Sequence, residues 1–434
     1  WSRRAAARGR VFAAAPACRE AAALLRGRGL GHDPGSQFRL ADCLKLLGAI
    51  EASVGNAAEA ARAAAEACRI FRTLSEREPA LLPLFASALH NMAGVRLRCG
   101  DHGGAVSAAR QATELRRELA GSAMSRAELA DSLSQSSLAL QAAGLGGEAR
   151  AACAEAVAIY RHLAGREGEH FKADLASALR LGSQQALAEQ RWRDGLEMLD
   201  EEVALYRAQP ASLACARALA EALHNRGVFL GWLGEDAQAL AAAREALAVR
   251  RSLPRRAPAK ERADLAATLS FFGALALGLD LAGEAAAAFE EAVDLLQTLR
   301  DGVDLEIEKE LAKASVELAA VRARAGEIAA AAAASDVAAG AYGVIARQRA
   351  ETGDVSAHAN ALLQSGDLHR RAGAPDKAIA AYTAAAALRS ALNKAGGNEL
   401  VAIAAGQKLV ICLKRAGRVE EAREWAERLG VAPG

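Results

Sequence analysis

Aromatic residues make up only 4% of this 434-residue chain, and proline occurs only nine times. β-Sheets favour β-branched and aromatic side chains, whereas much of the 52% hydrophobic fraction here is alanine. The scarcity of proline leaves long stretches in which a helix can continue without losing a hydrogen bond. The composition therefore favours closely packed α-helices over sheets.

An excess of charge of either sign is also missing. The chain has 54 Lys and Arg residues against 52 Asp and Glu residues, a formal net charge of +2. Proteins that bind nucleic acid usually carry a strongly basic face, so no nucleic-acid partner is expected. The most apolar window, residues 265–279, is too short to span a bilayer, so no membrane partner is expected either.

The cysteines do not form a recognisable disulfide framework. They are odd in number, far apart in sequence and without a CxxC pair. They are Cys18, Cys43, Cys68, Cys99, Cys153, Cys215 and Cys412. We expect reduced, mostly buried thiols in a cytoplasmic protein. The sequence begins at Trp1 without a methionine or a signal-peptide pattern, which predicts a fragment of a longer protein or a processed chain.

Sequence motifs of catalysis are absent as well. The chain has no GxxxxGK[ST], no HExxH and no GxSxG string, and no two of its eight histidines are four residues apart. We therefore expect no enzymatic activity, no cofactor and no bound metal.

A short pattern recurs along the chain at intervals of 44 to 47 residues. Its first element is a glycine, replaced twice by another residue: Gly55, Gly100, Gly144, Gln190, Gly234, Asp280, Gly326, Gly373 and Gly417. Its second is a small residue five positions later: Ala60, Ala105, Ala149, Gly195, Ala239, Ala285, Ala331, Ala378 and Ala422. Glycine readily adopts the left-handed conformation that ends a helix, and a small residue lets the next helix pack closely. The pattern predicts a series of helical hairpins.

A leucine recurs eleven residues before the first element in most repeats. The set is Leu44, Leu89, Leu133, Leu179, Leu223, Leu269 and Leu362, with Ser315 in the matching place of the seventh repeat. Such a stripe predicts the buried side of the first helix of each hairpin. Together these positions predict an all-α array of about nine antiparallel hairpins with a repeat of roughly 45 residues.

The repeating phrase resembles the tetratricopeptide repeat. The matching residues are Leu47, Gly48, Gly55, Glu59, Ala60 and Ala67 in the first repeat, Gly273, Ala285, Phe289 and Ala292 in the sixth, and Gly366, Gly373, Ala378, Tyr382 and Ala385 in the eighth. A standard repeat of this family has 34 residues, so the longer period is similar to that of kinesin light chain. The period alone would also suit HEAT or armadillo repeats, but the glycine and small-residue phrase favours tetratricopeptide. The resemblance implies a right-handed α-solenoid.

We expect a partial repeat and a glycine-rich linker over residues 1–36, followed by the array over 37–434. Gly9, Ala14, Cys18 and Ala21 fit the second half of the phrase, although Pro16 fits a helix poorly. In the first full repeat, helices are expected over 37–54 and 57–75. The predicted hairpins lie at about 37–80, 81–123, 124–168, 169–211, 212–258, 259–304, 305–353, 354–398 and 399–434.

The second and fifth repeats share the string ALHN, which ends in Asn91 and Asn225. Each asparagine follows the buried leucine by two residues and therefore points about 200° away from it around the helix. The resemblance implies that this position faces a concave groove, where the amide can donate to and accept from a peptide backbone. Gln135 and Gln364 occupy the same position in the third and eighth repeats.

Other positions expected to line the groove are polar or aromatic. They are His90, His224, Lys45, Arg98, Arg180, Trp232, Arg370 and Arg371. Their cationic balance predicts an acidic partner, and the tryptophan is a candidate for strong binding energy. The alternative that these residues only keep the inner face soluble stays open.

The sequence therefore predicts a non-catalytic protein-interaction scaffold or ligand-sensing repeat domain that binds a polypeptide in its groove. We expect it to belong to a larger bacterial signalling or defence protein. The alternative is a regulatory or substrate-docking arm of an enzyme whose catalytic module lies outside this sequence.

Overall fold

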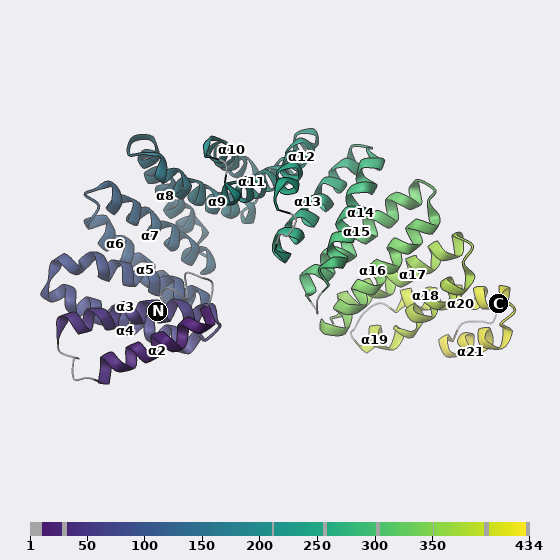
Figure 1. The fold of residues 1–434 in the computed structure, drawn as a ribbon. Helices are drawn as coiled ribbons and strands as arrows, with labels where there is room; N and C mark the ends of the chain where they lie inside the picture. Colours follow the sequence, from purple (N-terminus) through teal and green to yellow (C-terminus); the bar gives the residue numbers. More distant parts are fainter. Residues whose placement is uncertain are drawn as a thin grey trace. The chain divides into compact units, whose positions relative to one another are not determined.

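Helices follow one another along the whole described part of the chain (Figure 1). The computed structural model describes residues 11–27, 33–210, 212–254, 258–300, 304–349, 351–394 and 399–430, and none of these residues lies in a β-strand. The predicted all-α fold is thus confirmed. Two compact units divide the chain, Trp1–Ala208 and Gln209–Gly434.

Within its described residues, unit 1 contains one helix followed by four hairpins. Helix α2 (Val11–Gly27) precedes the hairpins α3 (Pro34–Ser53) with α4 (Ala57–Arg77), α5 (Leu82–Arg98) with α6 (His102–Glu118), α7 (Ala123–Ala142) with α8 (Gly146–Arg166), and α9 (Lys172–Ala188) with α10 (Trp192–Ala208). Short 3-10 turns, η2 (Pro79–Leu81) and η3 (Glu169–Phe171), lead into α5 and α9. Each helix packs against the next one in sequence from α2 to α10.

Unit 2 continues the same pattern. Its hairpins are α11 (Leu213–Trp232) with α12 (Asp236–Ser252), α13 (Ala259–Gly278) with α14 (Ala282–Thr298), α15 (Leu305–Arg324) with α16 (Ile328–Arg349), α17 (Thr352–Arg371) with α18 (Pro375–Ala387), and α20 (Leu400–Arg415) with α21 (Val419–Leu429). The short helix α19 (Arg389–Lys394) lies between the last two hairpins.

The turn between the two helices of every hairpin has the predicted left-handed residue. All nine positions of the first sequence element have positive φ, from 57° at Gln190 to 83° at Gly55. Gln190 and Asp280 (φ 61°) are the non-glycine residues with positive φ in the described part of the chain. The spacing of the repeat therefore predicted the helix reversals correctly, even at the two positions where glycine is absent.

The small residues five positions later are all buried, as predicted. Ala60, Ala285 and Ala378 are each 0% exposed. The leucine stripe is buried as well, except for Leu362, which is half-buried. Ser315, which replaces a stripe leucine, is fully buried, and its Oγ has no hydrogen-bond partner within the described residues.

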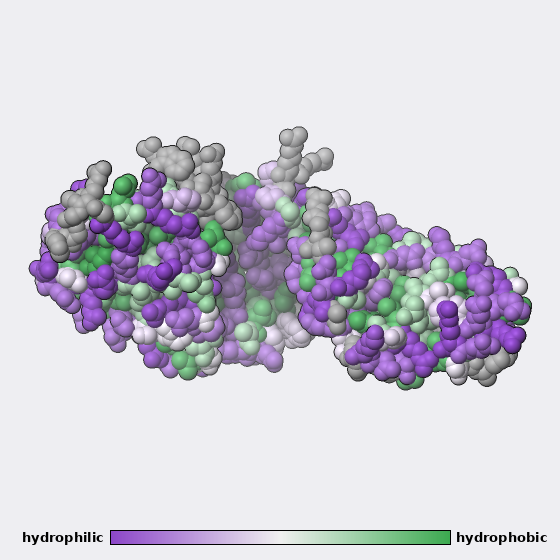
Figure 2. All heavy atoms as spheres, turned by 90° about the horizontal axis from the view of Figure 1, so that it is seen from below, coloured by the Kyte–Doolittle hydropathy of each residue, from purple (hydrophilic) through white to green (hydrophobic). Residues whose placement is uncertain are grey.

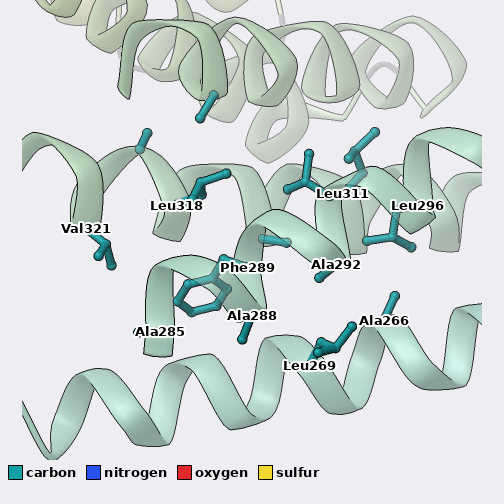
Figure 3. Close-up of a cluster of buried hydrophobic side chains, with 14 of the residues drawn as sticks. Ala266, Leu269, Ala285, Ala288, Phe289, Ala292, Leu296, Leu311, Leu318 and Val321 are labelled. Carbon is teal, nitrogen blue, oxygen red and sulfur yellow. The ribbon is translucent and has the colours of Figure 1, made fainter. Parts of the chain in front are cut away.

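Figure 3 shows how these positions build the core of unit 2. Leu269 of α13, Phe289 of α14 and Leu318 of α15 meet in one cluster of buried side chains. A methyl group added at Gly273 would lie only 2.9 Å from the Phe289 ring, so this glycine makes room for the aromatic side chain. Packing between neighbouring hairpins thus depends on pairs of small and large residues.

The start of the chain was predicted as a partial repeat and a glycine-rich linker over residues 1–36. Of residues 1–36, those numbered 1–10 and 28–32 lie outside the described residues. Helix α2 contains Pro16 in its interior and packs on α3 through the buried Cys18 and Ala22. Helix α3 begins already at Pro34, because the side chain of Asp33 accepts a hydrogen bond from the Ser36 amide.

Charged residues on the second helices form ion pairs between successive hairpins. An arginine 17 positions after one reversal meets a glutamate 11 positions after the next reversal. The pairs are Arg117–Glu155, Arg161–Glu201 and Arg251–Glu291, with N–O distances of 2.8, 2.6 and 2.5 Å, and Arg26 of α2 meets Glu66 of α4 in the same way at 2.5 Å. We call this set the Arg–Glu ladder. Each exposed pair contributes at most about 1 kcal/mol, so the ladder sets register more than stability.

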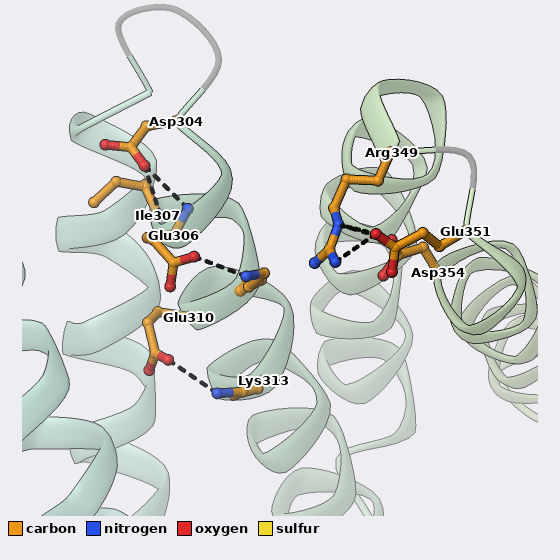
Figure 4. Close-up of polar contacts among 9 residues, drawn as sticks. Asp304, Glu306, Ile307, Glu310, Lys313, Arg349, Glu351 and Asp354 are labelled. Carbon is orange, nitrogen blue, oxygen red and sulfur yellow. Dashed lines mark hydrogen bonds and ion pairs between the residues drawn. The ribbon is translucent and has the colours of Figure 1, made fainter. Parts of the chain in front are cut away.

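A helix cap and a pair of ion pairs lie at the loops of unit 2 (Figure 4). Asp304 accepts hydrogen bonds from the backbone amides of Glu306 and Ile307 at the start of α15. Arg349, near the end of α16, lies 2.6 Å from Glu351 and 3.5 Å from Asp354, which begin the next helix. These contacts hold the turn from one hairpin to the next.

Helix α16 is long and apolar enough to cross a membrane by length and composition alone. Half of its most apolar window is buried inside the protein, where α16 packs against α15 and α17. The core helix of a helical array has the same properties, so this helix is explained by its packing.

Candidate functional site: the inner surface of the first helices

The first helices of neighbouring hairpins contact one another directly. In unit 1, α3 contacts α5, α5 contacts α7, and α7 contacts α9; in unit 2, α13 contacts α15 and α17 contacts α20. Within the described residues, neighbouring second helices make no comparable contact. The first helices therefore form the narrower side of each unit, which we call the inner surface.

The four amide residues predicted to face a groove all lie on first helices. Asn91 is on α5, Gln135 on α7, Asn225 on α11 and Gln364 on α17, and each is half-buried. Within the described part of the chain, no hydrogen bond engages the side chain of Asn91 or Asn225. In unit 1, Gln135 and Arg98 lie beside each other, since both approach within 3.7 Å of a methyl group placed on Gly94.

His90 and His224 lie deeper than a position on an open groove would place them. Burial lowers the pKa of each imidazole from 6.5 to about 4. The His224 ring packs edge-on against Phe271 at 5.3 Å, and its Nδ1 is buried without a hydrogen-bond partner among the described residues. Each histidine precedes its asparagine by one residue, so its side chain is rotated by about 100° around the helix axis. This rotation turns each histidine toward the neighbouring hairpin.

Two buried arginines accompany these histidines, and the sequence analysis did not identify them. Arg116 and Arg250 each follow their histidine by 26 residues, at a position where Phe71 and Tyr160 stand in other repeats. Burial lowers the pKa of both guanidinium groups. Arg116 Nη1 donates to the Glu128 carbonyl at 2.5 Å and to Ser132 Oγ at 2.8 Å. The paired recurrence of His and Arg at fixed register was the available signal.

The predicted cationic positions have different surroundings. Arg98, Arg370 and Arg371 are exposed, and Trp232 is 64% exposed. Lys45 lies 3.6 Å from Asp42 of the same helix. Hydrophilic and hydrophobic residues are interspersed on the face of the units seen in Figure 2.

Arg180 lines a pocket of about 280 Å³ in unit 1, between α7, α8 and α9. The other lining residues are Asp131, Ser134, Leu138, Tyr160, Asp174, Ser177, Ala178, Leu181 and Gln184. The buried Tyr160 donates its hydroxyl proton to Asp131 Oδ1 at 2.5 Å. Burial and, second, the Asp131 charge raise the pKa of Asp174. The pocket thus combines carboxylates, hydroxyl groups, a guanidinium group and an apolar wall. Of these lining residues, Arg180 is the one that was predicted to line the groove.

One serine, aspartate and histidine cluster in unit 2 resembles a hydrolase triad only in composition. The Ser365 hydroxyl donates to Asp336 Oδ1 at 2.5 Å, and His369 Nε2 lies 2.9 Å from Asp336 Oδ2. A nucleophilic serine needs the histidine as its own hydrogen-bond partner, whereas here both residues bind the same carboxylate. The cluster is a structural link between α16 and α17.

The cysteines and acidic residues give no other chemical centre in the described part of the chain. Its cysteines are all free, as predicted, and burial raises the pKa of Cys68 to about 12 and that of Cys153 to about 11. These thiols are therefore not nucleophiles at neutral pH. The described residues contain no group of three or more His, Cys, Asp or Glu that could hold a metal ion.

Comparison with known proteins places this arrangement among helical repeat proteins. Residues 219–253, which span the hairpin of α11 and α12, match the family model described as Tetratricopeptide repeat. No curated protein sequence matches the chain. The solved structure of the apo form of RapI is 14% identical, with a TM-score of 0.56 over 92% of this chain and 98% of RapI.

Two shorter solved structures are also similar. BtubC (BKLC) from P. vanneervenii is 17% identical, with a TM-score of 0.47 over 56% of this chain and 92% of its own. A putative kinesin light chain from Podosopora anserina is 15% identical, with a TM-score of 0.42 over 51% of this chain and 99% of its own. The chain therefore carries a tetratricopeptide repeat at residues 219–253 within a tetratricopeptide-like α-solenoid fold, the fold that it shares with RapI.

Proposed function

We propose that the chain is a non-catalytic interaction scaffold or ligand-sensing repeat domain that binds a polypeptide along its inner surface. The repeat fold supports this proposal, because stacked hairpins present extended surfaces that such proteins use for binding.

The observation that carries the proposal is the set of amide side chains at one register of the first helices. Asn91, Gln135, Asn225 and Gln364 each present a donor and an acceptor, the two groups that an extended peptide backbone requires. The second helices differ, since many of their charged side chains already pair in the Arg–Glu ladder. The inner surface therefore offers a partner amide donors and acceptors at one repeated register.

We further infer that part of the partner is acidic, because Arg98, Arg370 and Arg371 are exposed on or beside first helices. Opposite charges accelerate association, so the on-rate should fall with added salt. A cytoplasmic location, a larger bacterial signalling or defence protein, and the absence of nucleic-acid and membrane partners belong to the same proposal and rest on the sequence.

The test is a partner captured with the full chain and then titrated by calorimetry. The double variant Asn91→Ala with Asn225→Ala should bind at least about tenfold more weakly, since each lost amide contact costs about 1 kcal/mol and 1.4 kcal/mol is one decade. Gln297→Ala, which removes an exposed amide from the second helix α14, should bind like the wild type. Equal affinities for all three proteins, or crosslinks to the second helices, would overturn the assignment.

A further inference from the structure

The hairpin reversals in the described part of unit 2 differ in charge along the chain. Because the hairpins pack side by side in chain order, their reversals follow one another along one edge of the unit, which we call the reversal edge (Figure 1). The first two reversals, residues 230–238 and 276–284, each contain two acidic residues and no basic ones. The last three, residues 322–330, 369–377 and 413–421, contain eight Lys and Arg against four Asp and Glu. The reversal edge thus has an acidic part followed by a basic part.

An arginine stands two residues before the glycine of each reversal in the basic part. Arg324, Arg371 and Arg415 are all exposed, and within the described residues none of them forms an ion pair or a side-chain hydrogen bond. Glu327 and Glu421, two of the acidic residues there, already pair with other arginines. The end of a first helix does not require a cation at this position, since other hairpins have Ser53, Ala142, Ala188 and Gly278. The three arginines therefore carry positive charge that no ion pair within the described chain compensates.

The acidic part is left without cationic partners in the same way. Asp236 and Asp280 are exposed and form no ion pair among the described residues, and Glu235 accepts a hydrogen bond from the neutral Gln238 amide at 2.6 Å. Large apolar side chains reach solvent beside these carboxylates, at Trp232, Leu279 and Leu281. Trp232 is 64% exposed, and an exposed aromatic residue is a frequent anchor of protein contacts. The acidic part therefore has the features of a contact surface for a basic one.

We propose that unit 2 associates with a second copy of this chain along the reversal edge. A two-fold axis across the edge places the basic part of each copy against the acidic part of the other, so both unlike pairs form at once. Arg324, Arg371 and Arg415 of one copy then face the three carboxylates of the acidic part in its partner. A parallel arrangement of the two edges would oppose like charges, which disfavours it. Because the two-fold contact closes on itself, the product is a dimer and not an open chain.

The association is weak and salt-sensitive. Only turns and helix ends take part, so we expect a contact below the roughly 1,200 Å² that stable interfaces bury. Its exposed charges are screened by added salt. The inference goes beyond the proposed function and does not depend on it, since the amide residues of the inner surface take no part. Arg371 belongs to both surfaces, so an acidic partner and a second copy would compete for it.

The test is sedimentation velocity of the full chain between about 1 and about 100 µM, where a weak dimer forms and dissociates. At low salt the wild type should shift from monomer to dimer as its concentration rises, and about 0.5 M sodium chloride should abolish the shift. Two reversed variants should stay monomeric. The basic-reversed variant combines Arg324→Glu, Arg371→Glu and Arg415→Glu, and the acidic-reversed variant combines Glu235→Lys, Asp236→Lys and Asp280→Lys.

A control variant separates the position of the charges from the net charge. It changes three exposed arginines of unit 1, and its members are Arg69→Glu, Arg77→Glu and Arg166→Glu. Its net charge equals that of the basic-reversed variant, yet it should dimerise like the wild type. A loss of the dimer in the control as well would show a general charge effect and overturn the assignment to the reversal edge.

Mixing the two reversed variants gives a signal that misfolded proteins cannot give. The basic-reversed variant is acidic in both parts of its edge, and the acidic-reversed variant is basic in both. An equimolar mixture should therefore form a heterodimer at a concentration where each variant alone is a monomer. The variant with all six changes should dimerise with itself again, because its two parts are exchanged.

Three results would contradict the proposal. One is a wild type that stays monomeric at low salt and about 100 µM. Another is a dimer that both reversed variants retain, and a third is growth beyond the dimer, which would mean an open contact. If the wild type is monomeric but binds fluorescent poly-glutamate, and the basic-reversed variant does not, the basic part holds a foreign acidic segment and self-association is wrong.

Discussion

Acidification from pH 6.5 to pH 4 should destabilise both units through His90 and His224. Burial lowers the pKa of each imidazole from 6.5 to about 4, so the unfolded chain takes up these protons before the folded chain does. Above pH 6.5 both histidines are neutral in the folded and unfolded chain, so the free energy of unfolding is not reduced by them. It falls as the pH falls from 6.5 toward 4, because the unfolded chain is protonated first. A shift of about 2.5 pKa units at ~1.4 kcal/mol per unit gives an upper bound of roughly 3 kcal/mol for each histidine.

The assay is hydrogen exchange followed by mass spectrometry, because unfolding of a repeat array need not be a single transition. Between pH 6.5 and 4, the protection free energy of α5 and α11 should fall by up to about 1.4 kcal/mol per pH unit, after correction for the intrinsic exchange rate. His90→Gln should remove this slope from α5 alone, and His224→Gln from α11 alone. Each variant is the control for the other, since the two helices belong to different units.

The pH dependence of the protection free energy, and not the absolute stability of each variant, tests the role of the two histidines. Glutamine can lower the stability of a buried site at every pH, but it does not titrate in this range. If both variants keep the wild-type slope in both helices, the acid response comes from other groups and the argument from histidine burial is wrong.

Three further predictions concern the packing at Gly366, the left-handed turn at Gln190 and the ion pair of Arg161. Gly366→Ala places a methyl carbon 2.5 Å from the Tyr382 ring and should cost about 1–3 kcal/mol in thermal unfolding, whereas Gly353→Ala on the same helix, with open space around it, should cost nothing. Gln190→Gly should stabilise unit 1 by about 1 kcal/mol, because φ is 57° there; an unchanged melting temperature would contradict this. Arg161→Gln should cost less than about 1 kcal/mol, and that loss should vanish at 1 M salt.

The hairpins could be predicted from sequence because their determinants are local. A reversal needs a left-handed residue, and a close helix crossing needs a small one, so both requirements recur at fixed register. Gln190 shows the strength of that register, since glutamine alone would not suggest a left-handed turn. Pro16 shows the opposite: it argued against a helix, but packing of Cys18 and Ala22 on α3 keeps α2 continuous around it.

The inner surface was harder to predict because it depends on how neighbouring hairpins meet. Residue spacing predicted the side of the helix for Asn91 but did not show that His90, one position earlier, contacts Ser132 of the next hairpin. Arg116 was unexpected because the matching position is aromatic in other repeats. Its hydrogen bonds to the Glu128 carbonyl and to Ser132, which the sequence does not show, explain how a charged residue can be buried there. The repeated Asp-x-x-Ser-x-x-x-Leu spacing of α7 and α9 was present in the sequence and could have indicated the pocket.

The Arg–Glu ladder lets certain hairpins be removed without loss of its pairing. The rungs that begin at Arg117, Arg161 and Arg251 join position 17 of one repeat to position 11 of the next, so a new junction keeps a rung wherever these two positions hold arginine and glutamate. Excision of residues 100–143 would bring Arg72 to the place of Arg117, opposite Glu155, and excision of residues 144–189 would bring Glu201 opposite Arg117. Excision of residues 280–325 would instead bring Val337 opposite Arg251. The same array can therefore be shortened by one hairpin in unit 1 with its ion pairs kept, whereas insertion of part of a period would misalign them.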